Sequence, residues 1–267
     1  MIVYPNAKIN IGLKILSKRP DGFHNLESIF YPIPWYDILE INPSNHFEFK
    51  TFGLKIGGDH HHNLVVKAYQ LIKNKYHIPD CKIHLHKQIP MGAGLGGGSS
   101  DGAFTLTLLN DLFCLNMSIT ELILLADTLG SDCPFFIENK PKFVTGKGEV
   151  MTDIDLSLKG FYIKLVNPNI HISTKQVFEG LDLSKTNHCD FYGIDTKALF
   201  NKQTCVTNDF EHTVFSTYPK LKKIKNTIIN EGALYASMTG TGSTIYGIFK
   251  NKPQPSFSNL TEKIIEL

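Results

Sequence analysis

One stretch of small residues constrains this chain more than any other. It joins a strand-like run to a helix-like run and reads Pro90-Met91-Gly92-Ala93-Gly94-Leu95-Gly96-Gly97-Gly98-Ser99-Ser100-Asp101. Glycines let backbone N–H groups approach an anion without interference from Cβ, and the following helix adds its unpaired N–H groups and the positive end of its dipole. Ser99 and Ser100 follow, where hydroxyls can reach phosphate oxygens or a phosphate-bound Mg²⁺. The stretch therefore predicts a phosphate-binding loop.

Two familiar nucleotide loops fit this stretch poorly. A dinucleotide-binding loop would be followed about 20 residues later by an acidic residue at the end of a strand. The acidic residue at that distance here is Asp111, which lies in an apolar helical run. The P-loop pattern fails because no Lys-Ser or Lys-Thr follows the glycines. A flexible turn is the remaining alternative, but turns need one or two glycines. We favour the phosphate loop.

The length and composition point to a two-domain chain that binds a small anion. The 267 residues, 42% of them hydrophobic, can bury a sizeable core. A net charge of +2 with interspersed acids argues against a polyanion such as duplex nucleic acid. The five scattered cysteines contain no C-x-x-C pair, which favours reduced thiols, and no apolar run approaches a membrane span. We expect a soluble, untargeted, cytoplasmic protein.

The composition changes near residues 155–160, where we place the domain boundary, giving domains 1–157 and 158–267. Beyond the boundary the pattern predicts a strand over 161–166 and helices over 174–181, 209–215 and 221–231. A strand pair and a C-terminal helix follow.

The first strand carries two polar side chains on one face. Between Ala7 and Leu16 apolar and polar residues alternate, so Lys8 and Asn10 point the same way, about 7 Å apart. The turn signal 19–22 then brings Phe23-His24 back along an antiparallel partner.

Two histidine groups invite a metal interpretation that the spacing does not support. His60-His61-His62 diverge on a loop, and no Cys or carboxylate follows at ligand spacing. His84 and His86 share a strand face but have no third ligand, so half-exposed surface histidines are the better interpretation. We assign no direct protein ligand to a metal.

Two further loops carry candidate site residues. Asp132 lies between a glycine that ends a helix, Gly130, and an apolar run, which is a poor core position for an acid. The second loop contains Thr239-Gly240-Thr241-Gly242 between two apolar strands. A hairpin turn and a backbone that approaches a ligand explain this loop equally well.

Taken together, these motifs resemble a known family over essentially the whole chain. The glycine stretch 90–100 and residues 238–242 look like the two glycine motifs of the GHMP kinases. Five motifs in order then resemble one family among them, the 4-diphosphocytidyl-2-C-methyl-D-erythritol kinases: 7–10, 19–24, 95–100, 130–134 and 208–211. Two departures are Phe23, where the family commonly has Tyr, and Asp101-Gly102, where it often has Asn-Ala. Asp101 is expected to add a negative charge near the phosphates and so to make Mg²⁺ more necessary.

The resemblance implies an α+β fold of two domains, an N-terminal ribosomal-S5-like domain and a C-terminal ferredoxin-like domain with a cleft between them. It implies ATP and Mg²⁺ as cofactors and ATP binding by residues 90–100. Lys8 and Asp132 would be catalytic, with Lys8 stabilising charge and Asp132 acting as a base or as an orienter of the hydroxyl. The substrate-binding residues carried over are Asn10, Phe23, His24 and, from a looser match, Thr174 and Phe178.

The implied activity is ATP-dependent phosphorylation of the 2-hydroxyl of a cytidine-diphosphate sugar alcohol in isoprenoid precursor synthesis, by a monomer or homodimer without nucleic-acid or membrane partners. A homoserine or mevalonate kinase is one alternative. Against it, Phe23 suits stacking on a cytosine ring and His24 suits a hydrogen bond to the ring's edge. A non-catalytic S5-like binding module is the second alternative, and the balanced charge argues against it.

Overall fold

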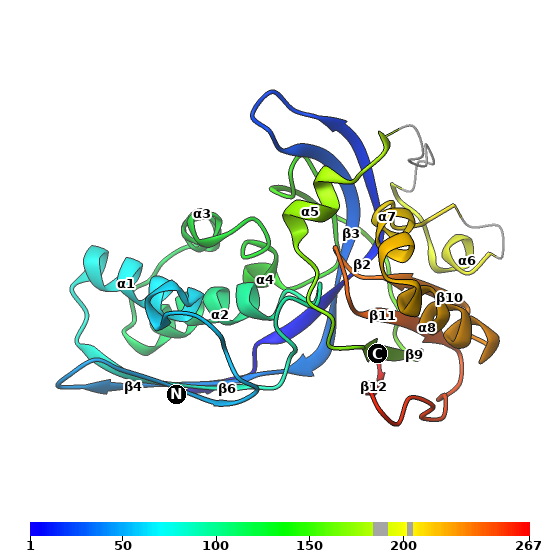
Figure 1. Ribbon diagram of the computed structural model, residues 1–267. Helices are drawn as coiled ribbons and strands as arrows, with labels where there is room; N and C mark the ends of the chain where they lie inside the picture. The colour runs from blue at the N-terminus through cyan, green and yellow to red at the C-terminus, as the bar shows by residue number, and fades with distance from the viewer. Residues whose placement is uncertain (184–191, 202–204) are drawn as a thin grey trace. The chain divides into compact units, whose positions relative to one another are not determined.

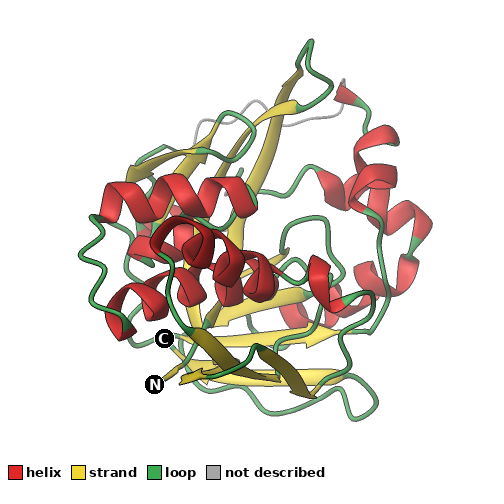
Figure 2. Ribbon diagram, turned by 90° about the vertical axis from the view of Figure 1, so that its left-hand side faces the viewer, coloured by secondary structure: helices red, strands yellow, loops and turns green. Residues whose placement is uncertain are grey.

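The computed structural model describes residues 1–183, 192–201 and 205–267. Its backbone falls into two compact units. Unit 1 comprises Met1–Lys8, Pro34–Met91 and Gly96–Lys140; unit 2 comprises Ile9–Ile33, Gly92–Leu95 and Pro141–Leu267. Helices and strands occur together in the described chain (Figure 2). The chain passes between the units several times, and the domain boundary at residue 157 stays a prediction.

Unit 1 contains a four-stranded sheet in the order β1-β4-β6-β5. Its strands are β1 (Ile2–Val3), β4 (Ile38–Ser44), β5 (Glu48–Gly53) and β6 (Asp80–Lys87). β6 pairs with β4 antiparallel and with β5 in parallel. Burial alternates along β6, where Cys81, Ile83 and Leu85 are buried, and the same period carries Lys87 onto the buried face.

The helices of unit 1 are η1 (His60–His62), α1 (Leu64–Tyr76), α2 (Gly97–Leu112), α3 (Ile119–Leu129) and α4 (Phe135–Glu138). Figure 1 shows α1, α2 and α3 on the same side of β4 and β6. Polar side chains cap the N-termini of α1 and α3. The Asn63 side chain accepts a hydrogen bond from the N–H of Val65, and Ser118 and Glu121 form a capping box.

A long hairpin opens unit 2. Its strands are β2 (Asn6–Lys18) and β3 (His24–Tyr36), which continue into a sheet of order β2-β3-β7-β8 with β7 (Lys142–Thr145) and β8 (Val150–Asp153). The predicted turn is present, with the N–H of Gly22 donating to the Arg19 carbonyl at 3.1 Å. Residues 6–13 of β2 are buried on both faces, so its polar face is not a solvated one.

The second sheet of unit 2 is antiparallel, in the order β10-β11-β9-β12. Its strands are β9 (Tyr162–Asn167), β10 (Tyr235–Met238), β11 (Ile245–Phe249) and β12 (Thr261–Glu266). Numbered in chain order this is 2-3-1-4, as the ferredoxin-like expectation requires. The helices of the unit are α5 (Thr174–Glu179), α6 (Thr196–Leu199), α7 (Phe210–Thr217) and α8 (Pro219–Asn230).

The predicted C-terminal helix is wrong, because that segment is strand β12. Its apolar residues, Ile264 and Ile265, are only half-buried at an edge of the sheet. The loop before it is held by the buried Lys164, which donates to Glu231 at 2.6 Å and to the Gln254 carbonyl at 2.7 Å. The local sequence pattern of residues 261–266 is ambiguous between helix and strand, and pairing with β9 makes the segment a strand.

The cysteines only partly match expectation. Cys81, Cys114 and Cys133 are free thiols. Cys205 is disulfide-bonded, so the prediction of reduced thiols is wrong at that position. Across the described ranges, every helix is too short or too polar to cross a membrane.

Candidate active site

The glycine stretch ends in an uncapped helix start in unit 1. Gly96 is the N-cap of α2, with φ +68°, and it has no side chain to accept a hydrogen bond from the first turn, which also contains no acid. A Cβ built at Gly98 would meet nothing within 4 Å. The Ser100 hydroxyl is buried and has no hydrogen-bond partner among the described residues. The first turn of α2 thus offers open N–H groups and a positive dipole end to an anion.

Lys8 and Asp132 form an ion pair beside this helix start. The Lys8 Nζ lies 3.4 Å from the Asp132 Oδ2. The Lys8 side chain is only 4% exposed whereas that of Asp132 is 32% exposed, so the carboxylate can be reached from solvent. A Cβ on Gly96 would come within 3.0 Å of the Lys8 Cγ, which places the lysine stem directly against the loop. Within unit 1 the structure therefore brings together the two predicted catalytic side chains and the start of α2.

The first half of the glycine stretch, residues 92–95, lies in unit 2 against the second glycine loop. Gly94 has φ +76°, and a Cβ there would lie 2.0 Å from the Thr239 carbonyl oxygen. The Thr239 hydroxyl donates to the Gly94 carbonyl at 2.8 Å, and the Asn208 amide donates to the Met238 and Gly240 carbonyls, each at 2.8 Å. Glycine at position 94 is therefore required for contact between two backbones. A Cβ on Gly240 would in turn lie 3.2 Å from the Gly94 Cα, so this contact is a third explanation for the second glycine loop, besides the hairpin turn and the approach to a ligand.

Asn10 is held by neighbouring protein groups. It is 2% exposed, its Nδ2 donates to the Ser28 hydroxyl at 2.9 Å, and its backbone N–H donates to the Thr239 hydroxyl at 3.0 Å. The first bond joins β2 to β3, and the second ties the β2–β3 hairpin to the second glycine loop. The predicted role of Asn10 in substrate binding stays a prediction.

The other four predicted substrate-binding residues line one pocket of unit 2. Its volume is about 510 Å³, and its lining comprises Lys18, Gly22, Phe23, His24, Thr174, Lys175, Phe178 and Glu179. The rings of His24 and Phe178 stack at 4.9 Å, and Phe23 is 57% exposed. Partial burial, followed by the charge of Lys18, lowers the pKa of His24, which favours the neutral ring at pH 7. The pocket offers two aromatic faces and a neutral imidazole.

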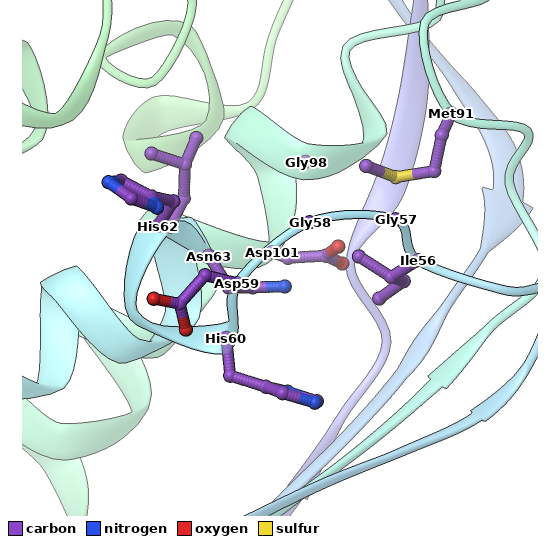
Figure 3. A pocket seen from close by; sticks show the side chains of 11 residues that line it. Ile56, Gly57, Gly58, Asp59, His60, His62, Asn63, Met91, Gly98 and Asp101 are labelled. Atoms are coloured by element: carbon purple, nitrogen blue, oxygen red, sulfur yellow. The ribbon is translucent and has the colours of Figure 1, made fainter.

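A second pocket, in unit 1, adjoins the start of α2 (Figure 3). Its volume is about 250 Å³, and it is lined by Ile56, Gly57, Gly58, Asp59, His60, His62, Asn63, Leu64, Met91, Gly98 and Asp101. The histidine run predicted as a solvated loop is the exposed helix η1, and it supplies one wall. Met91 and Gly98, both from the predicted ATP-binding stretch, supply another.

A buried charge cluster that sequence reasoning missed lies behind this pocket. The Lys87 ammonium pairs with Asp37 and, at 2.7 Å, with the Asp101 Oδ2. The clue in the sequence was the alternation that carries Lys87 onto the buried face of β6. The expectation that Asp101 adds an open negative charge near the phosphates is wrong, because the residue is 2% exposed and paired with Lys87.

The described residues contain no group of three or more metal-ligating side chains suited to a metal ion. Mg²⁺ needs no such cage, since one or two protein oxygens and the substrate phosphates suffice. The exposed part of the Asp132 carboxylate and the Ser99 hydroxyl supply oxygen ligands of the required kind.

Comparison with known families finds two matching domains. The GHMP kinases N terminal domain matches residues 63–140, and the GHMP kinases C terminal domain matches residues 197–257.

Similar proteins cover nearly the whole chain. A 4-diphosphocytidyl-2-C-methyl-D-erythritol kinase from Cytophaga hutchinsonii is 46% identical, over 97% of this chain and 96% of its own. One from Bacteroides fragilis strain YCH46 is also 46% identical, over 93% and 92% of the two chains. The crystal structure of a 4-(cytidine 5'-diphospho)-2C-methyl-D-erythritol kinase superposes with a TM-score of 0.82 at 28% identity, covering 93% of this chain and 90% of that one. The mevalonate kinase of Methanococcus jannaschii shares the fold only, with a TM-score of 0.69 at 15% identity and coverage of 93% and 90%.

Proposed function

This chain belongs to the 4-diphosphocytidyl-2-C-methyl-D-erythritol kinases of the GHMP kinase family, and from that membership we propose that it transfers the γ-phosphoryl group of ATP to the 2-hydroxyl of 4-diphosphocytidyl-2-C-methyl-D-erythritol. The observation that carries the proposal is the Lys8–Asp132 ion pair beside the uncapped start of α2. An anion-binding helix start, a cation and an accessible carboxylate are the groups that phosphoryl transfer to an alcohol requires.

ATP binds, in this proposal, with its phosphates on the first turn of α2 and its base in the unit 1 pocket. The pocket is lined by Gly98 of that same turn, which makes the two adjacent. Ile56, Leu64 and Met91 supply apolar contacts for a flat base. Mg²⁺, when bound, neutralises charge on the phosphates, and Asp132 and Ser99 are the residues that would contact it.

Lys8 and Asp132 have different roles at the acceptor hydroxyl. The Asp132 carboxylate accepts the hydroxyl proton as the oxygen attacks the γ-phosphorus and ADP leaves. The Lys8 ammonium stabilises negative charge that develops on the transferred group. Because the Lys8 side chain is buried against Gly96, its ammonium is held in place before substrate arrives.

The cytidine moiety occupies the unit 2 pocket that contains Phe23, His24 and Phe178. The aromatic faces suit a pyrimidine ring, and the neutral His24 can hydrogen-bond its edge. Lys18 and Lys175 on the pocket wall provide positive charge for a diphosphate. The cytoplasmic location and a monomeric or dimeric state stay predictions.

A direct assay tests this function. Purified protein with ATP, Mg²⁺ and the cytidine substrate should form ADP and a product heavier by one phosphoryl group, with the phosphate on the 2-hydroxyl by ³¹P and ¹³C NMR. Homoserine and mevalonate serve as competing acceptors. If the protein phosphorylated homoserine or mevalonate but not the cytidine compound, the substrate assignment would be overturned and the assignment as a small-molecule kinase would stand.

His24→Ala is expected to raise the KM for the cytidine substrate by about 10- to 100-fold and to leave the ATP KM nearly unchanged. The reason is the loss of one hydrogen bond and of the stacking on Phe178. Steady-state kinetics with each substrate varied at saturation of the other measures both constants. His86→Ala, an exposed histidine on β6, is the matched control. A parallel rise in both KM values would show that His24 only supports the turn.

A further inference from the structure

Among the sequence motifs that resemble the kinase family, residues 208–211 have no role in the proposed function. Asn208 opens this motif and is 2% exposed. Its Nδ2 donates to the carbonyl oxygens of Met238 and Gly240, each at 2.8 Å, and its Oδ1 accepts from the Phe210 N–H at 3.0 Å. Because only the nitrogen of a carboxamide can donate, these three partners fix the orientation of the side chain. The amide therefore joins the start of α7 to the backbone of the second glycine loop.

Met238, the residue before the second glycine loop, is held on both sides of its Cα. Its N–H donates to the Glu211 Oε1 at 2.8 Å, and its carbonyl accepts from Asn208. The same Asn208 nitrogen reaches Gly240, which lies inside the loop and has φ +55°. Two residues of one motif thus fix the backbone where the loop begins and one carbonyl within it.

The second glycine loop in turn contacts the predicted ATP-binding stretch within unit 2. The Thr239 hydroxyl donates to the Gly94 carbonyl at 2.8 Å, and a Cβ on Gly240 would lie 3.2 Å from the Gly94 Cα. Because backbone packs directly against backbone, the loop cannot shift toward Gly94 without displacing it. Two residues later in the sequence, Gly96 is the N-cap of α2. The position of the loop therefore affects the chain that leads into α2.

We propose that Asn208 is a positioning residue for nucleotide binding: its amide holds the second glycine loop against Gly94 and so keeps the ATP-binding stretch in its binding conformation. The inference rests on the proposed function, which places the ATP phosphates on the first turn of α2. Asn208 acts through the loop and not through a contact of its own with the nucleotide. Without its two donors the Met238 and Gly240 carbonyls lose their partner, and the loop moves to regain one.

Asn208→Asp is the sharpest test because it keeps the size of the side chain. Its carboxylate still accepts from the Phe210 N–H, but the oxygen that replaces Nδ2 cannot donate and faces two carbonyl oxygens. Calorimetric titration should therefore show that the variant binds ATP about ten-fold or more weakly than wild-type protein does. The affinity for the cytidine substrate should stay within about three-fold, because Phe210, whose ring packs on Phe178 of that pocket, keeps its hydrogen bond.

Two companion variants separate loop position from charge and from stability. Asn208→Ala removes the donors without adding a charge, should also weaken ATP binding about ten-fold, and keeps the test valid if Asn208→Asp is unstable. Val214→Ala is the matched control, because it removes core volume from α7, where Val214 is 1% exposed, but none of these hydrogen bonds. It should lower the melting temperature in thermal unfolding and leave ATP binding within about two-fold of wild type.

This inference would be overturned, and the kinase function would stand, if Asn208→Asp bound ATP as wild-type protein does or lost affinity equally for ATP and for the cytidine substrate. An equal loss of ATP binding in Val214→Ala would overturn it as well, because lost stability would then be the cause. A loss in Asn208→Asp without any in Asn208→Ala would assign the effect to the added charge and overturn it too. Wild-type protein that binds no ATP would overturn both the inference and the proposed function.

Discussion

Asp132→Asn is expected to lower kcat by about 10³-fold while both KM values stay within a few-fold. The amide cannot accept the proton of the substrate hydroxyl, and general base catalysis contributes about 10² to 10⁴ in rate. The substitution preserves side-chain size, and at 32% exposure the side chain contributes little to the core. Steady-state kinetics and calorimetric binding of ATP and of the cytidine substrate separate turnover from affinity.

Asp127→Asn is the matched control for this prediction. It removes the same charge from an exposed position on α3, a few residues before Asp132, and should leave kcat unchanged. A tenfold or smaller loss of kcat in Asp132→Asn would reduce Asp132 to an orienting role. A similar loss in both variants would instead indicate a general electrostatic effect.

The parts of the fold that the sequence predicts are those governed by local chemistry. The α+β GHMP kinase fold is confirmed by the family matches and the solved relative. The N-cap at Asn63 and the capping box of Ser118 and Glu121 are of this local kind, because each depends on residues at most three apart in the sequence. The prediction of a C-terminal helix was wrong because the segment forms β12, and β12 depends on pairing with β9, about a hundred residues earlier.

The site shows the same division. Lys8 and Asp132 were predicted through short motifs, and the structure places them 3.4 Å apart. Residues Phe23, His24, Thr174 and Phe178 were predicted in two separate segments and line one pocket. The cluster of Lys87, Asp37 and Asp101 was missed because its members come from β6, the connection between β3 and β4, and α2, and only the tertiary structure brings the three charges together.

Gly94→Ala is expected to cost at least about 3 kcal/mol in free energy of unfolding and to lower kcat/KM for ATP by more than about ten-fold. Alanine disfavours the φ of +76°, and its Cβ would lie 2.0 Å from the Thr239 carbonyl oxygen and 2.8 Å from the carbonyl carbon. Because the opposing atoms are backbone, the loop and the β10–β11 turn must separate, which breaks the Thr239 hydrogen bond to the Gly94 carbonyl. Urea unfolding followed by circular dichroism measures the stability, and ATP kinetics measure the displacement of the loop.

Gly160→Ala separates the two causes of that loss. Gly160 has nearly the same φ, +80°, but a Cβ there meets nothing within 4 Å. It should therefore suffer only the backbone strain, about 1 to 2 kcal/mol, and keep wild-type kinetics. The excess cost in Gly94→Ala then measures the contact between the two glycine loops. Equal losses in the two variants would mean that the loops need not touch, and glycine at position 94 would be explained by its φ alone.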